Sequence, residues 1–436
     1  MISFSRFFPS LLPLVSAGFA LLPIALPLHA SSKVEIAKNG DQFQLMVNGQ
    51  PFFINGVGGT HNLALLKQLG GNSLRTWGIE SLAEVVEGKP LIDRAQDVGL
   101  MVTAGIWVQH QGPNFNYDDQ AAVDKQRETV RKAVQTYKDS PALLIWGLGN
   151  ETEGPASDGS DLRIWKELNV LAGIVKEEDP NHPVMTVIAS ATPLKVKNAQ
   201  EYCPNIDILG VNAYGSASGV GAAVTQAGWT KPFILTEFGP TGQWEVPKTP
   251  WGAPIEATAN EKAASYFATQ KLVTDDSKNI CLGTYAFLWG NKQEATATWY
   301  GMFLASGEKL PPVDAMSYAW TGQWPATRCP KLKTLTTSVT EKTVGPGISA
   351  TAMVDATDPN GAPLQYEWAV VEENKKIGVG GEAEPVPASH PECITGTQDS
   401  SLTFTTPTTP GAYRLFLTIR DGKGGATTAN VPFQVQ

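Results

Sequence analysis

The chain carries an apolar run that ends in an amide and a carboxylate, at Leu143-Leu144-Ile145-Trp146-Gly147-Leu148-Gly149-Asn150-Glu151. A second carboxylate, Glu237, ends the shorter run Phe233-Ile234-Leu235-Thr236. Apolar runs without polar alternation are typical of parallel strands that are buried on both faces. In a barrel of alternating strands and helices, the carboxyl ends of the strands meet at one mouth. The two stretches therefore predict a barrel with a pair of carboxylates at its mouth.

Eight such apolar runs follow one another along the chain, with helix-like segments between most of them. The runs span residues 52–56, 73–77, 101–107, 143–149, 184–189, 206–211, 233–237 and 283–289. Apolar residues at helical spacing mark the segments 121–137, 161–178 and 260–273. Eight strand–helix units predict an α/β fold, a closed (β/α)8 TIM barrel over residues 51–326. A doubly wound sheet is the alternative, but the first strand–helix unit of this chain has no GxGxxG loop.

Two smaller regions flank the predicted barrel. Residues 34–47 alternate apolar and polar side chains around Asn39-Gly40, which predicts a β-hairpin within residues 31–50. Residues 331–436 are rich in Thr, Val, Ala and Gly, with turn sequences at 358–361 and 421–424. Strands are expected at 350–354, 364–371, 401–405, 413–419 and 426–435. This region is therefore expected to form a smaller all-β, immunoglobulin-like sandwich.

The first thirty residues have the pattern of a signal peptide. Arg6 precedes an apolar stretch at 11–28, and Leu28-His29-Ala30 offers a cleavage site. An uncleaved membrane anchor is the alternative. No later stretch reaches the roughly 18–20 apolar residues of a spanning helix. We expect an exported protein, periplasmic or extracellular, with no stable membrane insertion after cleavage. The formal net charge of −9 argues against nucleic acid as a partner, and the oligomeric state is left open.

Cysteine and histidine usage gives no indication of a metal or another cofactor. Cys203, Cys281, Cys329 and Cys393 form no CxxC pair, and the five histidines form no HExxH motif. An oxidising compartment permits disulfides. Pairing of Cys329 with Cys393 and of Cys203 with Cys281 is one of three possible arrangements.

The strand count indicates what the carboxylates do. It places Glu151 at the end of the fourth strand and Glu237 at the end of the seventh, across the mouth from each other. Two facing carboxylates are the minimum equipment for cleaving a glycosidic bond. A separation of about 5–5.5 Å between them goes with retention of configuration, and about 6.5–9.5 Å with inversion.

Motifs at these strand ends resemble the clan of retaining glycosidases that carry their catalytic glutamates on barrel strands four and seven. They are Gly149-Asn150-Glu151, Asn212-Ala213-Tyr214 and Thr236-Glu237-Phe238-Gly239. Together with the stretch 47–56, they are most similar to the barrel domain of family 2 glycosidases. The stretch 65–75 also resembles fungal β-1,3-glucanosyltransferases. Family 2 enzymes carry sandwich domains before the barrel, whereas this chain is expected to have only a hairpin there. Residues 355–368 and 413–421 resemble immunoglobulin-like domains of the polycystic-kidney-disease type.

The chemistry and the resemblance together imply roles for the strand-end residues. Glu151 is expected to act as general acid and then base, and Glu237 as nucleophile. Asn150 is expected to bond the sugar 2-OH and Tyr214 to orient Glu237. Arg75 is expected to keep Glu237 ionised, with a purely structural salt bridge as the alternative.

Further residues are candidates for binding. Trp289 is expected to form an apolar platform under the sugar ring, unless it only packs in the barrel. Trp77, Trp107 and His110 are expected to line the sugar site, although His110 also fits a solvated loop. Asn212 either bonds sugar or braces its strand end.

These features predict an exported retaining β-glycosidase that acts on a β-linked glucan or related polysaccharide. The long loop 239–258, with Trp244 and Trp251, and the segment 291–300 suit an oligo- or polysaccharide substrate, although either also fits a lid that packs on itself. One alternative is a β-glucan transglycosylase that uses the same glutamates. The other is a non-catalytic carbohydrate-binding or scaffold protein.

Overall fold

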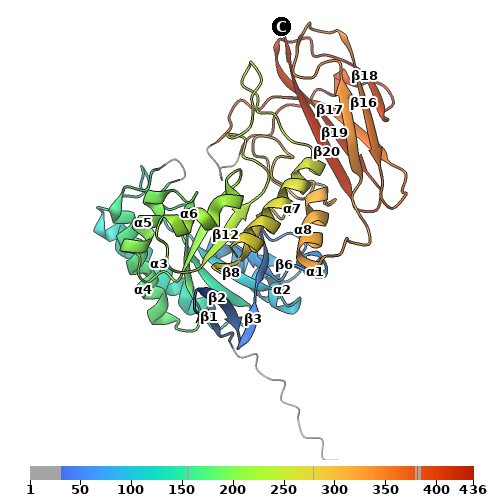
Figure 1. Cartoon of the computed structure of the whole chain (residues 1–436). Helices are drawn as coiled ribbons and strands as arrows, with labels where there is room; N and C mark the ends of the chain where they lie inside the picture. The colour runs from blue at the N-terminus through green and yellow to red at the C-terminus, as the bar shows by residue number, and fades with distance from the viewer. Residues whose placement is uncertain (1–30, 155–156, 278, 379–380, 382–383) are drawn as a thin grey trace, which may run out of the picture.

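The computed structural model describes residues 31–154, 157–277, 279–378, 381 and 384–436, so the predicted signal peptide lies outside the described residues. The described chain forms a closed parallel barrel followed by a β-sheet domain (Figure 1). The predicted fold class is therefore confirmed. Across the described ranges, none of the helices combines the length and apolarity that a membrane span requires.

Eight parallel strands close the barrel in chain order. They are β4 (Ile54–Gly58), β5 (Ser73–Arg75), β8 (Met101–Ile106), β9 (Leu143–Leu148), β10 (Val184–Ala189), β11 (Ile208–Asn212), β12 (Phe233–Phe238) and β13 (Cys281–Phe287). Each overlaps one predicted apolar run. The first begins later than predicted, because β3 (Gln50–Phe52) pairs with the preceding hairpin instead. Pairing of β13 with β4 closes the barrel.

Helices cover the outside of the barrel (Figure 1). The three predicted helices are α3 (Gln120–Tyr137), α4 (Leu162–Glu178) and α7 (Ala259–Asp276). Asp119 and Asp161 cap the first two, and Thr258 forms a capping box with Glu261 at the third. Elements without a strong sequence signal are α1 (Leu63–Gln68), α2 (Leu91–Asp97), α5 (Pro193–Tyr202), α6 (Val220–Gln226), α8 (Pro311–Thr321), the strands β6 (Val85–Val86) and β7 (Lys89–Pro90), and 3-10 turns at Ile79–Ala83, Ala217–Gly219 and Pro391–Cys393.

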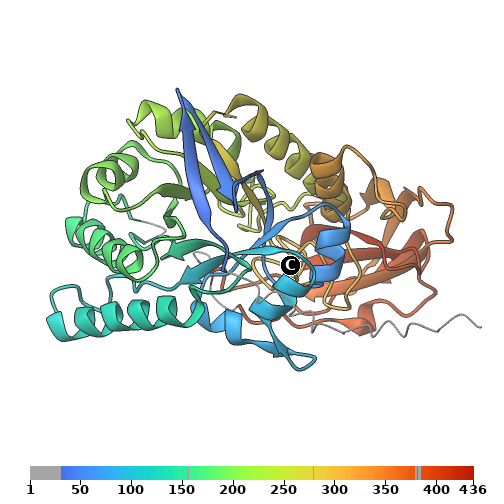
Figure 2. The ribbon, with the colours of Figure 1, turned by 90° about the horizontal axis from the view of Figure 1, so that it is seen from below.

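The predicted hairpin closes the N-terminal end of the barrel. β1 (Val34–Asn39) and β2 (Gln42–Val47) pair in antiparallel fashion, and β3 extends them to three strands. Figure 2 shows this sheet in blue, lying across the end of the barrel. Val34 and Leu45 are buried in one core with Leu144 and Met185 from the barrel strands. The carboxyl end of the barrel is thereby left as the open end.

The C-terminal domain consists of two sheets that share a core. One contains β14 (Lys331–Thr337), β16 (Ser349–Thr357) and β18 (Ser401–Thr405), and the other β15 (Thr343–Val344), β20 (Ala426–Val435), β19 (Gly411–Arg420) and β17 (Gln365–Glu372). Val354 and Phe404 from the first sheet pack with Trp368 and Leu415 from the second. The five predicted strands are present, whereas β14 and β15 were not predicted. The domain stands beside α7 and α8 (Figure 1).

The suggested disulfides are wrong, because all four cysteines are buried free thiols. Cys203 donates to a carbonyl oxygen of α4, whereas Cys281 begins β13 on another part of the barrel. Cys329 donates to the carbonyl oxygen of Lys309, and Cys393 lies in the core of the C-terminal domain. Each thiol therefore occupies a separate packed environment. Burial raises the pKa of Cys203 and of Cys281 to about 12, which keeps both in the thiol form.

Candidate active site

The carboxyl ends of the barrel strands open into a large cleft, with a volume of about 1160 Å³. Most small-molecule sites measure roughly 300–1,000 Å³. Both Glu151 and Glu237 line this cleft. The other candidate residues that line it are Asn150, Asn212, Tyr214, Trp77, Trp107 and His110.

The carboxylate of Glu237 is held by three donors. Its Oε1 accepts from Trp77 Nε1 at 2.8 Å and from Arg75 Nη1 at 3.0 Å. Its Oε2 accepts from the Tyr214 hydroxyl at 2.9 Å. Burial and the neighbouring Glu237 raise the pKa of Tyr214 well above its ordinary value, so this hydroxyl keeps its proton. Donors arranged in this way hold the side chain in a fixed orientation.

Arg75 connects the two strand ends that carry the glutamates. Besides Glu237, it donates through Nη2 to Asn150 Oδ1 at 2.7 Å, and its side chain is only 2% exposed. The salt bridge with Glu237 is therefore part of the site itself. A buried guanidinium shared in this way fixes several neighbours at once.

Glu151 lies in a different electrostatic environment. Burial, followed by the charge of Glu237, raises the pKa of Glu151 to about 7, against an opposing hydrogen bond from Asn212. That bond joins Asn212 Nδ2 to Glu151 Oε1 at 2.8 Å. Glu151 also has a positive φ of 50°, and its backbone N–H donates to Val187 O at 2.9 Å. Left-handed backbone at a non-glycine residue costs conformational energy, and strained residues of this kind cluster at functional sites.

Asn212 braces the site from below. Its Nδ2 also donates to Asn150 Oδ1 at 3.1 Å, and its own Oδ1 accepts from Thr236 Oγ1 at 2.8 Å. These contacts agree with the second of the two roles expected for Asn212, which is to brace its strand end. With Oδ1 of Asn150 occupied by two donors, the amide NH2 of Asn150 is the group left for a ligand in the cleft. His110 Nε2 lies 3.2 Å from the Asn150 carbonyl oxygen, which fixes it beside the same residue.

A further carboxylate, which no sequence motif singled out, supports the loop that bears Glu151. Glu153 Oε1 accepts from Ala189 N at 2.8 Å and lies 3.0 Å from Lys195 Nζ. Both side chains of this ion pair are buried. In the sequence, the only indication of a role for Glu153 was its position two residues after Glu151.

Exposed aromatic rings stand in the cleft. Trp107, which follows β8, is 40% exposed, and Trp244 of the loop 239–258 is 53% exposed. The Trp244 ring meets Tyr214 edge-on, with centroids 5.7 Å apart. Large exposed tryptophans in a concave site are suited to stacking on the apolar faces of sugar rings.

The expectation for Trp289 is wrong. Its side chain is fully buried, its Nε1 donates to His61 O at 2.5 Å, and its ring packs on Phe303. It therefore offers no face to a ligand, in agreement with the packing alternative. Phe287 and Leu288 line the cleft at the end of β13 instead.

The two long mouth segments divide between binding surface and packing. In 239–258, Trp244 lines the cleft, and Glu245 Oε2 ties the loop by accepting from Gly215 N and Gly242 N. In 291–300, Lys292 and Glu294 line the cleft as an ion pair of 2.5 Å. Trp299 and Tyr300 of that segment are buried, so this part packs on itself.

A second polar constellation occupies the opposite end of the barrel. Ser32 Oγ lies 2.8 Å from His182 Nε2, and His182 Nδ1 lies 2.8 Å from Asp179 Oδ2. The order resembles a hydrolase triad. All three residues are at most 4% exposed, and the Ser32 hydroxyl donates to Leu143 O at the start of β9. This arrangement fixes the segment that precedes β1 to the N-terminal end of the barrel.

Comparisons with known proteins agree with the barrel fold. Residues 39–243 match the family model "Glycosyl hydrolases family 2, TIM barrel domain". The matched stretch contains both Glu151 and Glu237 and ends before β13. The barrel thus resembles family 2 barrel domains. No curated protein matches the chain.

Several solved structures share the fold at low sequence identity. A Bacteroides uniformis beta-glucuronidase is 13% identical, with a TM-score of 0.50, over 92% of this chain and 48% of that one. A GH2 beta-galacturonidase from Eisenbergiella tayi is 15% identical (TM-score 0.50; 67% and 54%). A Bifidobacterium dentium beta-glucuronidase is 16% identical (TM-score 0.50; 67% and 49%). The chain spans about half the length of these proteins.

Proposed function

We propose that this protein is an exported retaining β-glycosidase that acts on a β-linked glucan or related polysaccharide. The single observation that carries the proposal is the difference between the two carboxyl groups in the cleft. Burial and the charge of Glu237 raise the pKa of Glu151 to about 7, whereas the Glu237 side chain accepts hydrogen bonds from three donors. Glycoside hydrolysis needs one carboxyl group that can donate a proton and one that is ionised.

The proposed first step forms a bond between a Glu237 oxygen and the anomeric carbon. As the glycosidic bond breaks, Glu151 gives its proton to the leaving oxygen, so the leaving sugar departs as an alcohol. The covalent ester takes over the negative charge of Glu237, and Glu151 becomes a carboxylate. Loss of the charge on Glu237 then lowers the pKa of Glu151, because the negative charge that raised this pKa is gone.

In the second step Glu151 removes a proton from water, and the water oxygen attacks the anomeric carbon. The ester bond breaks, and Glu237 is restored as a carboxylate. The Asn150 amide is placed to bond a sugar hydroxyl beside the anomeric carbon, a contact that strengthens in the transition state. Tyr214 and Trp77 position Glu237 for attack, and they donate hydrogen bonds to its carboxylate again after release.

The size of the cleft and the exposed rings of Trp107 and Trp244 support a substrate of several sugar units. The export proposal rests on the pattern of residues 1–30. The solved structures with this fold include enzymes named as glucuronidases and a galacturonidase. For this reason uronides belong in the test panel beside glucans and mannans.

The proposal is tested by mass spectrometry of products from β-gluco-, β-manno- and β-uronosyl oligosaccharides. Wild type should shorten at least one substrate, Glu237→Gln should be inactive, and Glu177→Gln on the outer helix α4 should match wild type. NMR of the first product formed should show the β anomer. Longer products would instead identify a transglycosylase. Binding without turnover would identify a scaffold protein and contradict the proposed hydrolysis.

A further inference from the structure

The cleft is not built by the barrel alone. Ile377, Gly378 and Gly381 line it together with the catalytic pair, and they belong to the connection between β17 and β18 of the C-terminal domain. The Ile377 side chain is 38% exposed, so an apolar surface of the second domain faces the cleft. Residues more than 220 positions after Glu151 therefore contribute to the same wall.

One carboxylate fixes this segment onto the barrel. Glu384 Oε2 accepts from the backbone N–H of Ala295 at 2.7 Å and from Asn374 Nδ2 at 2.6 Å. Its Oε1 accepts from Gly378 N at 2.9 Å. Glu384 thus joins the cleft-lining part of the C-terminal domain to the mouth segment 291–300.

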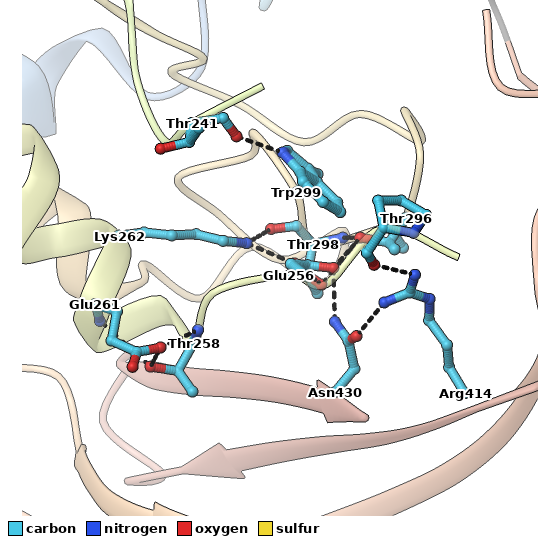
Figure 3. Close-up of polar contacts among 12 residues, drawn as sticks. Thr241, Glu256, Thr258, Glu261, Lys262, Thr296, Thr298, Trp299, Arg414 and Asn430 are labelled. Carbon is cyan, nitrogen blue, oxygen red and sulfur yellow. Dashed lines mark hydrogen bonds and ion pairs between the residues drawn. The ribbon is translucent and has the colours of Figure 1, made fainter. Parts of the chain in front are cut away.

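A second, buried cluster joins both mouth segments to the sheet of the C-terminal domain (Figure 3). Its centre is Glu256, at the end of the loop 239–258, which pairs with Lys262 at 2.5 Å. The Glu256 carboxylate also accepts from Thr296 Oγ1 at 2.6 Å and from Thr298 Oγ1 at 2.8 Å. From β20, Asn430 Nδ2 donates to Glu256 Oε2 at 2.6 Å.

Arg414 on β19 completes the cluster and is almost fully buried. Its Nη2 donates to Pro254 O at 2.6 Å, and its Nη1 donates to Asn430 Oδ1 at 2.7 Å. Glu373 balances its charge at 2.7 Å. Buried charges that are paired and joined by several hydrogen bonds permit few alternative geometries, so they fix the groups that they join. The loops 239–258 and 291–300 are therefore held in place by the second domain.

We propose that the C-terminal domain completes the substrate site: its residues Ile377 and Gly378 form the wall of a distal subsite, and Arg414 and Asn430 are positioning residues for the mouth loops. The ligand is an oligosaccharide long enough to reach from the catalytic pair to the second domain. The inference rests on the proposed function for its substrate class. It implies an enzyme that prefers long chains over short ones.

The test uses the full chain with Asn430→Asp. This change keeps the shape of the side chain and its bond with Arg414, but it places a carboxylate against Glu256 where an amide donated. The control is Gln434→Glu, which adds the same charge on the same strand, where Gln434 contacts Thr343 within the domain. Hydrogen exchange and the rate of cleavage are measured for both variants and wild type.

For Asn430→Asp we expect about tenfold faster amide exchange in 239–258 and 291–300, with the strands β9 and β12 unchanged. On β-gluco-oligosaccharides of two to eight units, the ratio of kcat/KM for the longest to the shortest should fall about tenfold, mainly through KM. Gln434→Glu should match wild type in both measurements.

The outcomes separate the inference from the proposed function. Unchanged exchange in the mouth loops of Asn430→Asp refutes the positioning role, whether or not a substrate is known. Faster exchange with an unchanged chain-length ratio refutes the distal subsite. Wild type that cleaves no oligosaccharide of the panel overturns the proposed function, and with it the oligosaccharide as the ligand, while the exchange result still decides the positioning role.

Discussion

Replacing Asn212 by alanine should move the alkaline limb of the pH–rate profile upward. In the structure Asn212 donates a 2.8 Å hydrogen bond to Glu151 Oε1, and this bond lowers the pKa of Glu151 against the larger raising effects of burial and of Glu237. A hydrogen bond to a charged group contributes about 1.5–3 kcal/mol, and one pH unit corresponds to about 1.36 kcal/mol. Water in the cleft replaces part of the lost bond, so we expect an upward move of about one unit.

The assay is kcat/KM against pH, which reports the free enzyme. Because Glu151 must be protonated to act as the acid, activity in wild type should fall above pH 7, near its pKa of about 7. In Asn212→Ala the fall should begin about one unit higher, at a lower maximal rate. Trp107→Ala, a change in the cleft wall, should lower kcat/KM without moving the limb. An alkaline limb that stays in place or moves downward in Asn212→Ala would refute the assignment of Glu151 as the acid.

Two further predictions concern stability. Because the pKa of Glu151 is raised from 4.5 to about 7, the stability that its protonated form provides is complete below pH 4.5 and lost as the pH rises through 7. In denaturant titrations Glu151→Gln should therefore stabilise the fold by about 3 kcal/mol at pH 8 and hardly at pH 4.5, and an equal gain at both values would contradict this. Ser32→Ala should lower the free energy of unfolding by about 1–3 kcal/mol, because it leaves His182 Nε2 without its partner, and should leave kcat/KM unchanged. Loss of activity at full stability would instead assign a catalytic role to Ser32, His182 and Asp179.

Much of the barrel was predictable because its signals are local. A strand that is buried on both faces must be apolar throughout. The helices α3, α4 and α7 are predictable from the spacing of their apolar residues and from their capping residues. The short helices α1, α2 and α6 carry only one or two turns, too few for a periodic pattern. The first strand was misplaced by two residues, because an apolar run does not reveal which neighbour it pairs with.

The site divides in the same way. The order of motifs placed Glu151 and Glu237 at the mouth, and both line the cleft. Sequence patterns did not distinguish Trp289, which is buried, from Phe287, which faces the cleft, because both lie in the predicted apolar run 283–289. The disulfide suggestion failed for a related reason, since spacing along the chain says nothing about the distance between sulfur atoms.

The sequence by itself determined the succession of strands and helices, and with it the strand ends that carry Asn150, Glu151 and Glu237, because periodicity and covalent order are properties of the chain. Only the tertiary structure decided the chemical state of these groups. Arg75 reaches Glu237 across 162 positions, and burial beside Glu237 gives Glu151 its raised pKa. Only folding brings Ile377 of the second domain to the cleft. Electrostatic and packing interactions depend on distance in space, which the order of residues leaves open.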